Sequence, residues 1–127
     1  MTQEDGRNAE LLEAWRSLSG SHAVVVDALE RELQDRHGLT VSEFEVLQRL
    51  AESPERHSRM QELADAVHLS QSALSRLIGR LEKDGLVNRA LCELDRRGIY
   101  ACLTDAGEEL VKQAEPTQHE VLAAKLR

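Results

Sequence analysis

The feature that most constrains this chain is a change of hydrophobic periodicity at Gly85. Before that glycine, apolar residues recur at helical spacing over residues 60–67 and again over 70–84. After it come two short runs of β-forming residues, 86–92 and 99–103. Two short helices joined by a tight turn form a helix-turn-helix unit. We therefore expect such a unit to be followed directly by a β-hairpin.

The flanking segments read as helices with recognisable ends. Thr40 opens a Ser/Thr-x-x-Glu capping box for a helix that ends near residues 53–54. We expect residues 55–59 to form a polar loop. Thr104 caps a last helix, and Pro116 is expected to interrupt its apolar pattern. The predicted fold class is therefore mainly α with a small β-hairpin.

The first segment reads as one long helix, from about residue 8 to residue 37, that ends at Gly38. A stripe with a nearly 3.5-residue repeat on so long a helix needs a partner helix. That partner is either the core of the same chain or another subunit, and the pattern alone favours neither. Apart from His22, which fills a gap, the stripe consists of Leu11, Trp15, Leu18, Val25, Leu29 and Leu33.

The charge of the chain is unevenly distributed. The net charge of −7 argues at first sight against a nucleic-acid partner. Between Ser70 and Gly98, however, six basic residues face four acidic ones, a net charge of +2, so the remainder carries −9. The positive charge is thus concentrated in the segment that contains the helix-turn-helix and the hairpin, and its distribution matters more than the total.

Composition excludes several classes of protein. Apolar stretches such as residues 23–26 are far too short for a membrane span, and the polar, acidic N-terminus is no signal peptide, so we expect a cytoplasmic protein. Two cysteines are too few for a disulfide scaffold, and the five histidines are scattered, so we expect no metal site and no cofactor. The chain lacks a Gly-rich phosphate loop and a nucleophile in a recognised context, which predicts that it is not an enzyme.

The outer face of the helix over 70–84 carries groups suited to reading DNA. Gln and Arg side chains can pair bidentately with base edges, while Ser hydroxyls and a helix N-terminus suit phosphates. Small side chains around them let a helix sit deep in a major groove. Taken alone, the two helices could equally belong to an ordinary helical core. The residues on this face are Gln71, Ser72, Ser75, Arg76, Gly79 and Arg80.

The hairpin adds independent support for a DNA-binding function. We expect residues 95–98 to form its charged tip, where Arg96 and Arg97 could place a guanidinium in the minor groove. Asp95 can hold an adjacent arginine in an extended rotamer. Alone, this tip could be a solvated turn. A helix-turn-helix followed directly by such a hairpin is a winged helix.

The stretch from about Met60 to Gly107 resembles the MarR family of bacterial regulators. The family pattern has a capped recognition helix, then L-E-K-x-G-L-V-x-R, a wing bearing D-R-R, and a closing L-T-x-x-G. This chain has the corresponding residues at 81–89, 95–97 and 103–107. The flanking helices match in order and length, so the resemblance covers nearly the whole chain.

The resemblance implies a homodimeric regulator that binds a pseudo-palindromic operator in double-stranded DNA, usually a repressor released by a small-molecule inducer. It implies a winged helix-turn-helix over residues 39–104, between dimerisation helices at 1–38 and 105–127. The family normally continues past the position of Leu126 with a further helix, so dimerisation here is expected to depend on the first helix and residues 121–126. The DNA contacts implied are Ser70, Gln71, Ser72, Ser75, Arg76 and Arg80, with Asp95, Arg96 and Arg97 in the wing.

Three further hypotheses remain open at this point. Trp15 and His22 lie where such regulators form a ligand pocket between the dimer arm and the winged domain, although a core aromatic and a hydrogen-bonded histidine are the simpler interpretation. Cys92 and Cys102 fall on the two hairpin strands and could approach each other, which would suit a redox-responsive regulator. Peroxide sensors of the family instead carry their cysteine in the first helix. Finally, an acidic winged helix could serve as a protein-interaction module.

Overall fold

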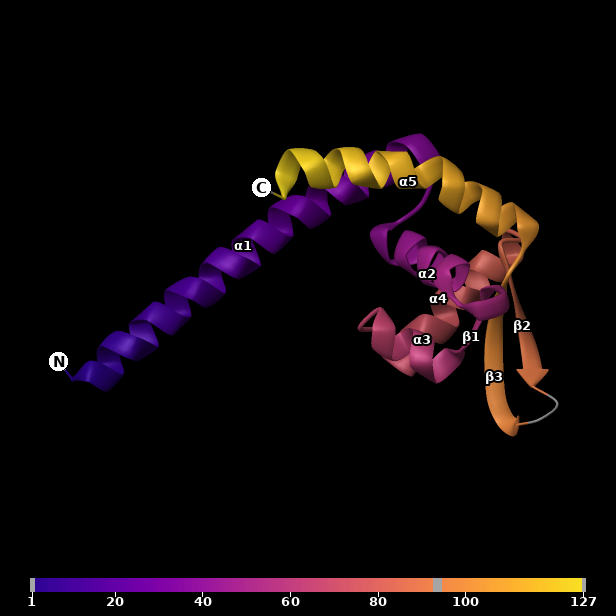
Figure 1. Cartoon of the computed structure of the whole chain (residues 1–127), viewed down its shortest axis with the longest axis horizontal. Helices are drawn as coiled ribbons and strands as arrows, with labels where there is room; N and C mark the ends of the chain where they lie inside the picture. Colours follow the sequence, from indigo (N-terminus) through magenta and orange to yellow (C-terminus); the bar gives the residue numbers. More distant parts are fainter. Residues whose placement is uncertain (1, 93–94, 127) are drawn as a thin grey trace.

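The computed structural model describes the backbone of residues 2–92 and 95–126 and the side chains of residues 2–90 and 98–126. The C-terminal helix packs beside the first helix (Figure 1). The helices and strands between them in the sequence lie on one side of this pair, and we call them the winged part. The elements are α1 (Gln3–His37), α2 (Val41–Glu52), the 3-10 turn η1 (Pro54–Arg56), β1 (His57–Arg59), α3 (Met60–Ala66), α4 (Gln71–Lys83), β2 (Val87–Cys92), β3 (Asp95–Leu103) and α5 (Asp105–Lys125).

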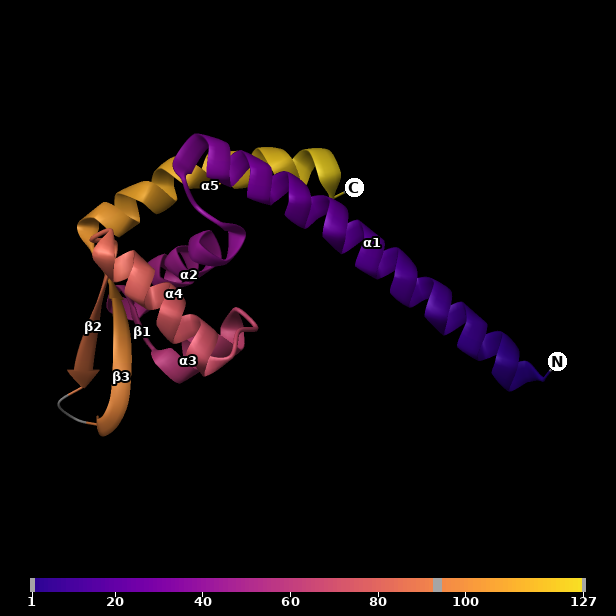
Figure 2. The ribbon, with the colours of Figure 1, turned by 180° about the vertical axis from the view of Figure 1, so that it is seen from behind.

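Helix α1 begins earlier than its hydrophobic pattern predicts, because Thr2 and Asp5 form a capping box at its start. At its other end Gly38 adopts a left-handed conformation (φ 68°), and its amide donates to the carbonyl oxygen of Gln34 at 3.0 Å. The predicted glycine stop is therefore confirmed. The N-terminal half of α1 projects away from the rest of the chain (Figures 1 and 2).

The apolar stripe of α1 divides into two parts. Leu29 and Leu33 are buried, whereas Leu11, Trp15 and Leu18 are 63%, 63% and 67% exposed. The end of the stripe near Gly38 therefore belongs to the core of this chain, and the N-terminal end lies outside that core. Among the described residues, none of the helices combines the length and apolar character that a membrane span requires.

The core lies where α2, α4 and the sheet meet. Phe44, Leu47 and Leu50 of α2 are at most 1% exposed, as the helical pattern predicts. Burial of such a side chain contributes about 1.5–3 kcal/mol, so this shared core holds the two helices in one orientation. The buried residues of α4 are Leu74, Leu77, Ile78 and Leu81, and those of the sheet include Val87, Ala101 and Leu103.

The sheet has three antiparallel strands in the order β1-β3-β2. The prediction of a polar loop over residues 55–59 is wrong for residues 57–59, which form β1 and pair with residues 100–102 of β3. Glu55 and Arg56 precede the strand with positive φ angles of 55° and 59°. These left-handed residues turn the chain sharply onto the edge of β3, a conformation that non-glycine residues adopt uncommonly.

The hairpin also differs from its predicted form. Residues 95–98 do not make its turn, because β3 begins at Asp95. Leu91 pairs with Ile99 and Cys92 pairs with Asp95, so the register shifts between Leu91 and Cys92. An irregularity of this kind absorbs additional residues in one strand. Strand β3 therefore includes, before Ile99, the charged residues that the sequence placed in the turn.

The two cysteines do not approach each other along the hairpin. Cys102 pairs with Asn88, whereas Cys92 pairs with Asp95. Residues 88 and 92 are four positions apart on β2, which corresponds to roughly 13 Å at about 3.3 Å per residue. A disulfide requires Cα atoms within about 7 Å. The expectation that Cys92 and Cys102 could approach each other is therefore wrong.

Helix α5 continues through Pro116 without a break, although the apolar pattern of the sequence is interrupted there. Side chains just after the proline are held by the neighbouring helices. Thr117, which is buried, lies with its Oγ1 2.8 Å from Nε2 of His37. Gln118 exchanges two hydrogen bonds with Gln48, at 2.9 and 3.1 Å. These contacts offset the helical hydrogen bond that a proline cannot make.

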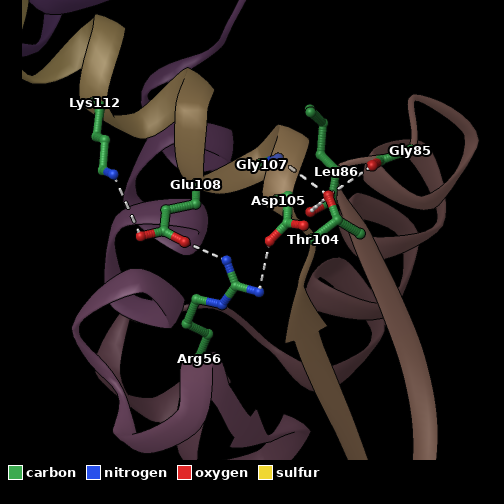
Figure 3. Close-up of polar contacts among 8 residues, drawn as sticks. All are labelled: Arg56, Gly85, Leu86, Thr104, Asp105, Gly107, Glu108 and Lys112. Carbon is green, nitrogen blue, oxygen red and sulfur yellow. Dashed lines mark hydrogen bonds and ion pairs between the residues drawn. The ribbon is translucent and has the colours of Figure 1, made fainter.

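The start of α5 is tied to the base of the hairpin through Thr104 (Figure 3). The Oγ1 of Thr104 accepts from the amide of Gly107 at 3.0 Å and donates to the carbonyl oxygen of Gly85 at 2.7 Å. The Thr104 amide donates to the carbonyl oxygen of Leu86 at 3.0 Å. The predicted N-cap is confirmed, and it also joins α5 to the turn that ends α4.

Arg56 makes a second set of contacts between the winged part and α5 (Figure 3). Its Nη2 donates to Oδ1 of Asp105 at 3.0 Å, and its Nη1 donates to Oε2 of Glu108. Lys112 lies 3.6 Å from the other oxygen of the Glu108 carboxylate. Hydrogen bonds to Asp105 and Glu108 raise the pKa of the Arg56 guanidinium above its usual range. The unusual backbone at Arg56 thus places its side chain against α5.

The close approach at Gly107 generates a prediction about stability. A Cβ atom added there would meet the backbone carbonyl of Leu86 and would lie 2.6 Å from Cδ1 of Leu103. We expect Gly107→Ala to lower the free energy of unfolding by about 2–3 kcal/mol, since a packed core tolerates added volume poorly. Urea denaturation measures this. Gly20→Ala is the control, because no atom lies within 4 Å of a Cβ there. Equal effects of the two substitutions would contradict the prediction.

Candidate nucleic-acid interface

Helix α4 packs one face against the core and exposes the opposite face. Ser70 is its N-cap, with Oγ accepting from the amide of Ala73 at 3.1 Å, as the sequence predicts. The preceding turn is tight because His68 adopts a positive φ of 58°. Since Leu74 and Ile78 are completely buried, the opposite face of the helix is directed away from the core.

Most of the residues predicted for this helix lie together on its outer face. Arg76 and Arg80 are one turn apart and exposed, so their guanidinium groups can reach a ligand from the same side of the helix. The other exposed members are at its N-terminal end, where free amides favour anions. These are Ser70, Gln71 and Ser72.

Ser75 differs from the other predicted residues. It is half-buried, and its Oγ accepts a hydrogen bond from Nη1 of Arg89 at 3.2 Å. Nη2 of Arg89 donates to the carbonyl oxygen of the same serine at 2.5 Å, and Nε of Arg89 lies 2.9 Å from Oε1 of Glu82. Arg89 is therefore a residue of this interface that sequence reasoning passed over, although it is the final position of the L-E-K-x-G-L-V-x-R pattern.

A narrow cleft separates the N-terminal half of α4 from β3. Two adjoining hollows of about 180 and 150 Å³ share Met60, Gln71 and Ile99 as lining residues. Arg59 lines the first of them, and its Nε donates to the hydroxyl of Tyr100 at 3.2 Å, with its guanidinium 5.8 Å from the ring centroid. A cation from β1 thus lies beside the start of α4. The sequence offered no signal for it, because it depends on the unpredicted strand.

The wing residues are described by their backbone. Asp95, Arg96 and Arg97 form the first part of β3. Their side chains lie outside the described residues, as does that of Cys92. The backbone alone places the pair of arginines at the start of the longer hairpin strand, at the end of the hairpin far from α5 (Figure 1).

The predicted ligand residues are not brought to the winged part within one chain. Trp15 and His22 are both exposed, and they lie on α1, on the N-terminal side of the buried Leu29 and Leu33. The winged part packs instead near the other end of that helix, where Leu29 and Leu33 are buried. A pocket containing Trp15 and His22 would therefore need a second subunit to complete it.

Several known proteins are similar in sequence to this chain. The MarR family profile matches residues 37–98. The homoprotocatechuate degradative operon repressor of Escherichia coli is 33% identical over 85 residues, which make up 67% of this chain and 56% of that repressor. The chain spans about half the length of the curated relatives it matches.

Solved structures extend the similarity beyond the winged part. Sco3205 of Streptomyces coelicolor, a MarR family transcriptional regulator in complex with DNA, matches with a TM-score of 0.85 and 38% identity over 92% of this chain and 73% of that chain. CouR of Rhodococcus jostii RHA1, bound to p-coumaroyl-CoA, matches with a TM-score of 0.77 and 28% identity over 84% of this chain and 73% of that chain. On this evidence, the chain belongs to the MarR family of transcriptional regulators.

Proposed function

We propose that this chain is a sequence-specific DNA-binding repressor that acts as a homodimer. The observation that carries the proposal is the division of α4 into a buried inner face and an exposed outer face with Gln71, Arg76 and Arg80. The relative Sco3205, at 38% identity, is a MarR family regulator in complex with DNA. A regulator of this kind acts on DNA in the cytoplasm and has no catalytic role.

In the proposed complex, the N-terminal half of α4 enters the major groove. Gln71 and Arg76 then face base edges, where amide and guanidinium groups pair bidentately. Ser70, Ser72 and Arg80 hold phosphates and set the register of the helix on the duplex. The wing residues 95–97 reach the neighbouring minor groove, whose negative potential favours arginine.

The projecting part of α1 supports the proposal of a homodimer. Leu11, Leu12, Trp15 and Leu18 form an exposed apolar stripe, and a contiguous stripe of this kind marks an interaction surface. We assign residues 1–38 and 105–127 to dimerisation and residues 39–104 to DNA binding. A symmetric dimer could place its two α4 helices about 34 Å apart, so that they read successive major grooves.

A small-molecule inducer fits the same arrangement. The relative CouR binds p-coumaroyl-CoA, and the Escherichia coli relative is a repressor of a degradative operon. We propose that an inducer binds between the dimer arm of one subunit and the winged part of the other, with Trp15 and His22 as lining residues. Binding there would change the spacing of the two α4 helices and release the DNA.

The function is tested by fluorescence anisotropy with the DNA upstream of the gene and with a scrambled duplex, at two salt concentrations. We expect Arg76→Ala/Arg80→Ala and Arg96→Ala/Arg97→Ala each to weaken binding. The first pair should also lower the salt slope by about 2, because a homodimer loses the Arg80 phosphate contact twice and each phosphate contact contributes about 0.9. Arg7→Ala/Arg49→Ala removes the same charge from exposed sites elsewhere and should leave the slope unchanged. A stable protein that ignores both duplexes would point instead to a protein-interaction module.

Ser70 should affect stability and DNA binding separately. Ser70→Ala removes the N-cap acceptor and should lower the free energy of unfolding by about 1 kcal/mol. Ser70→Asp preserves the cap but places a negative charge where a phosphate is expected, so it should keep stability and reduce DNA affinity by about tenfold. The control is Ser42→Asp, which makes the same change in the first turn of α2, away from the proposed interface. If Ser70→Asp bound DNA as the unchanged protein does, Ser70 would not face the phosphates.

The dimer proposal predicts that Trp15→Ser/Leu18→Ser yields a monomer in sedimentation equilibrium. Loss of the second half-site contact should then weaken operator binding by at least tenfold, since only one α4 helix engages the DNA. Glu13→Ser/Arg16→Ser introduces the same residues on another face of α1 and should leave the assembly intact. A dimer that persists in the Trp15/Leu18 variant would place the interface elsewhere.

A further inference from the structure

We propose that Arg89 is a positioning residue, which fixes α4 against the hairpin and so makes operator specificity depend on a side chain that reads no base. This inference rests on the proposed DNA-binding function. It assigns Arg89 a role different from that of Arg76 and Arg80. Those two arginines are exposed on the outer face of α4, whereas Arg89 belongs to β2 and is bonded to α4 itself.

The guanidinium of Arg89 spans two turns of α4. Nη1 and Nη2 donate to the hydroxyl and the carbonyl oxygen of Ser75, and Nε faces the carboxylate of Glu82 at 2.9 Å. Ser75 and Glu82 are seven residues apart, so they lie on the same face of the helix. One planar group therefore engages both ends of a two-turn segment, and we call this set of contacts the Arg89 clamp.

The sequence around the clamp suits it sterically. Gly79 lies between Ser75 and Glu82 on the same face, and a Cβ added there would be 3.6 Å from Nη2 of Arg89. A methyl group at this position would thus just reach the guanidinium at ordinary contact distance, and a longer side chain would displace it. An arginine is also required chemically, because its rigid fork presents several donors in fixed directions, whereas lysine presents one point charge.

The clamp connects the two parts of the interface that must act together. Arg89 pairs with Ala101 in the β2–β3 ladder, so the residue belongs to the hairpin that carries the wing. Its contacts therefore set the angle between the wing and α4. Base recognition requires side chains held within about 0.5 Å of their productive geometry, whereas attraction to phosphates does not. Loosening the clamp should consequently reduce binding to the operator and leave non-specific binding unchanged.

The alternative is that Arg89 simply contacts a phosphate. Its side chain is 33% exposed and that of Glu82 is 36% exposed, so both groups reach solvent. The two roles predict opposite results for Glu82. Removing an acidic charge near DNA should strengthen binding to every duplex if electrostatics alone matters. If Glu82 instead holds Arg89 in place, removing its charge should weaken binding to the operator.

The experiment compares Glu82→Gln and Arg89→Lys with the unchanged protein, on the upstream DNA and on a scrambled duplex, across a salt series. We expect both variants to lose about tenfold in affinity for the upstream DNA, with unchanged affinity for the scrambled duplex and an unchanged salt slope. Asp84→Asn removes an exposed acidic charge two residues further along and is the matched control, with no loss of specificity expected. Thermal unfolding checks that each variant is folded.

Two results would overturn the proposal. Glu82→Gln binding both duplexes as well as or better than the unchanged protein would show that the carboxylate only opposes DNA. Arg89→Lys binding the upstream DNA normally would show that a positive charge suffices, as at a phosphate contact. If the unchanged protein itself fails to distinguish the two duplexes, the proposed function falls together with the clamp, whereas failure of the variants alone removes only the clamp.

Discussion

The burial of the inner face of α4 is the constraint on which the rest of the interface depends. Leu74, Ile78 and Leu81 are completely buried, and each such side chain contributes about 1.5–3 kcal/mol to folding. Successive residues of a helix are about 100° apart, so rotating α4 by one residue would expose part of this face. The core therefore determines where Arg76 and Arg80 are directed. The same helix thus provides the buried inner face and the exposed outer face on which the proposed DNA contacts lie.

Polar contacts, rather than apolar packing alone, join the winged part to α5. The reciprocal amide pair of Gln48 and Gln118 and the bonds of Arg56 end on α5, and the contact between His37 and Thr117 joins α1 to the same helix. Hydrogen bonds depend steeply on direction. They therefore hold α5 at one angle to the winged part, and this angle would determine the separation of two α4 helices in a dimer.

The features that were predicted correctly from the sequence are those that depend on residues close together in the chain. The caps at Thr40, Ser70 and Thr104 and the glycine stop at Gly38 are local signals, and each is confirmed. Strand β1 was not predicted, because three residues carry too short a pattern and form a strand only by pairing with β3. The start of β3 was misplaced for a similar reason, since a register shift within the hairpin has no signature in the sequence.

The candidate site shows the same division between local and long-range information. Exposure of Gln71 and Arg76 follows from helical periodicity and could be predicted. The bond between Ser75 and Arg89 joins residues fourteen positions apart on two different elements, so it could not. The stripe on α1 combines local and long-range information. Its repeat predicted a partner without identifying it, and the structure shows that for Leu29 and Leu33 the partner is the core of this chain.

The acidic composition does not oppose DNA binding as strongly as the net charge of −7 suggests. Many of the acidic residues lie on α1, including Glu4, Glu10 and Glu13, and this part of the helix projects away from α4 and the hairpin (Figures 1 and 2). Exposed charges are largely screened beyond about 8–10 Å at physiological salt. Acidic residues close to the candidate interface, such as Glu82, therefore matter more than those on α1. Glu82 has its carboxylate 2.9 Å from Nε of Arg89, and in the arrangement that we propose it orients this guanidinium.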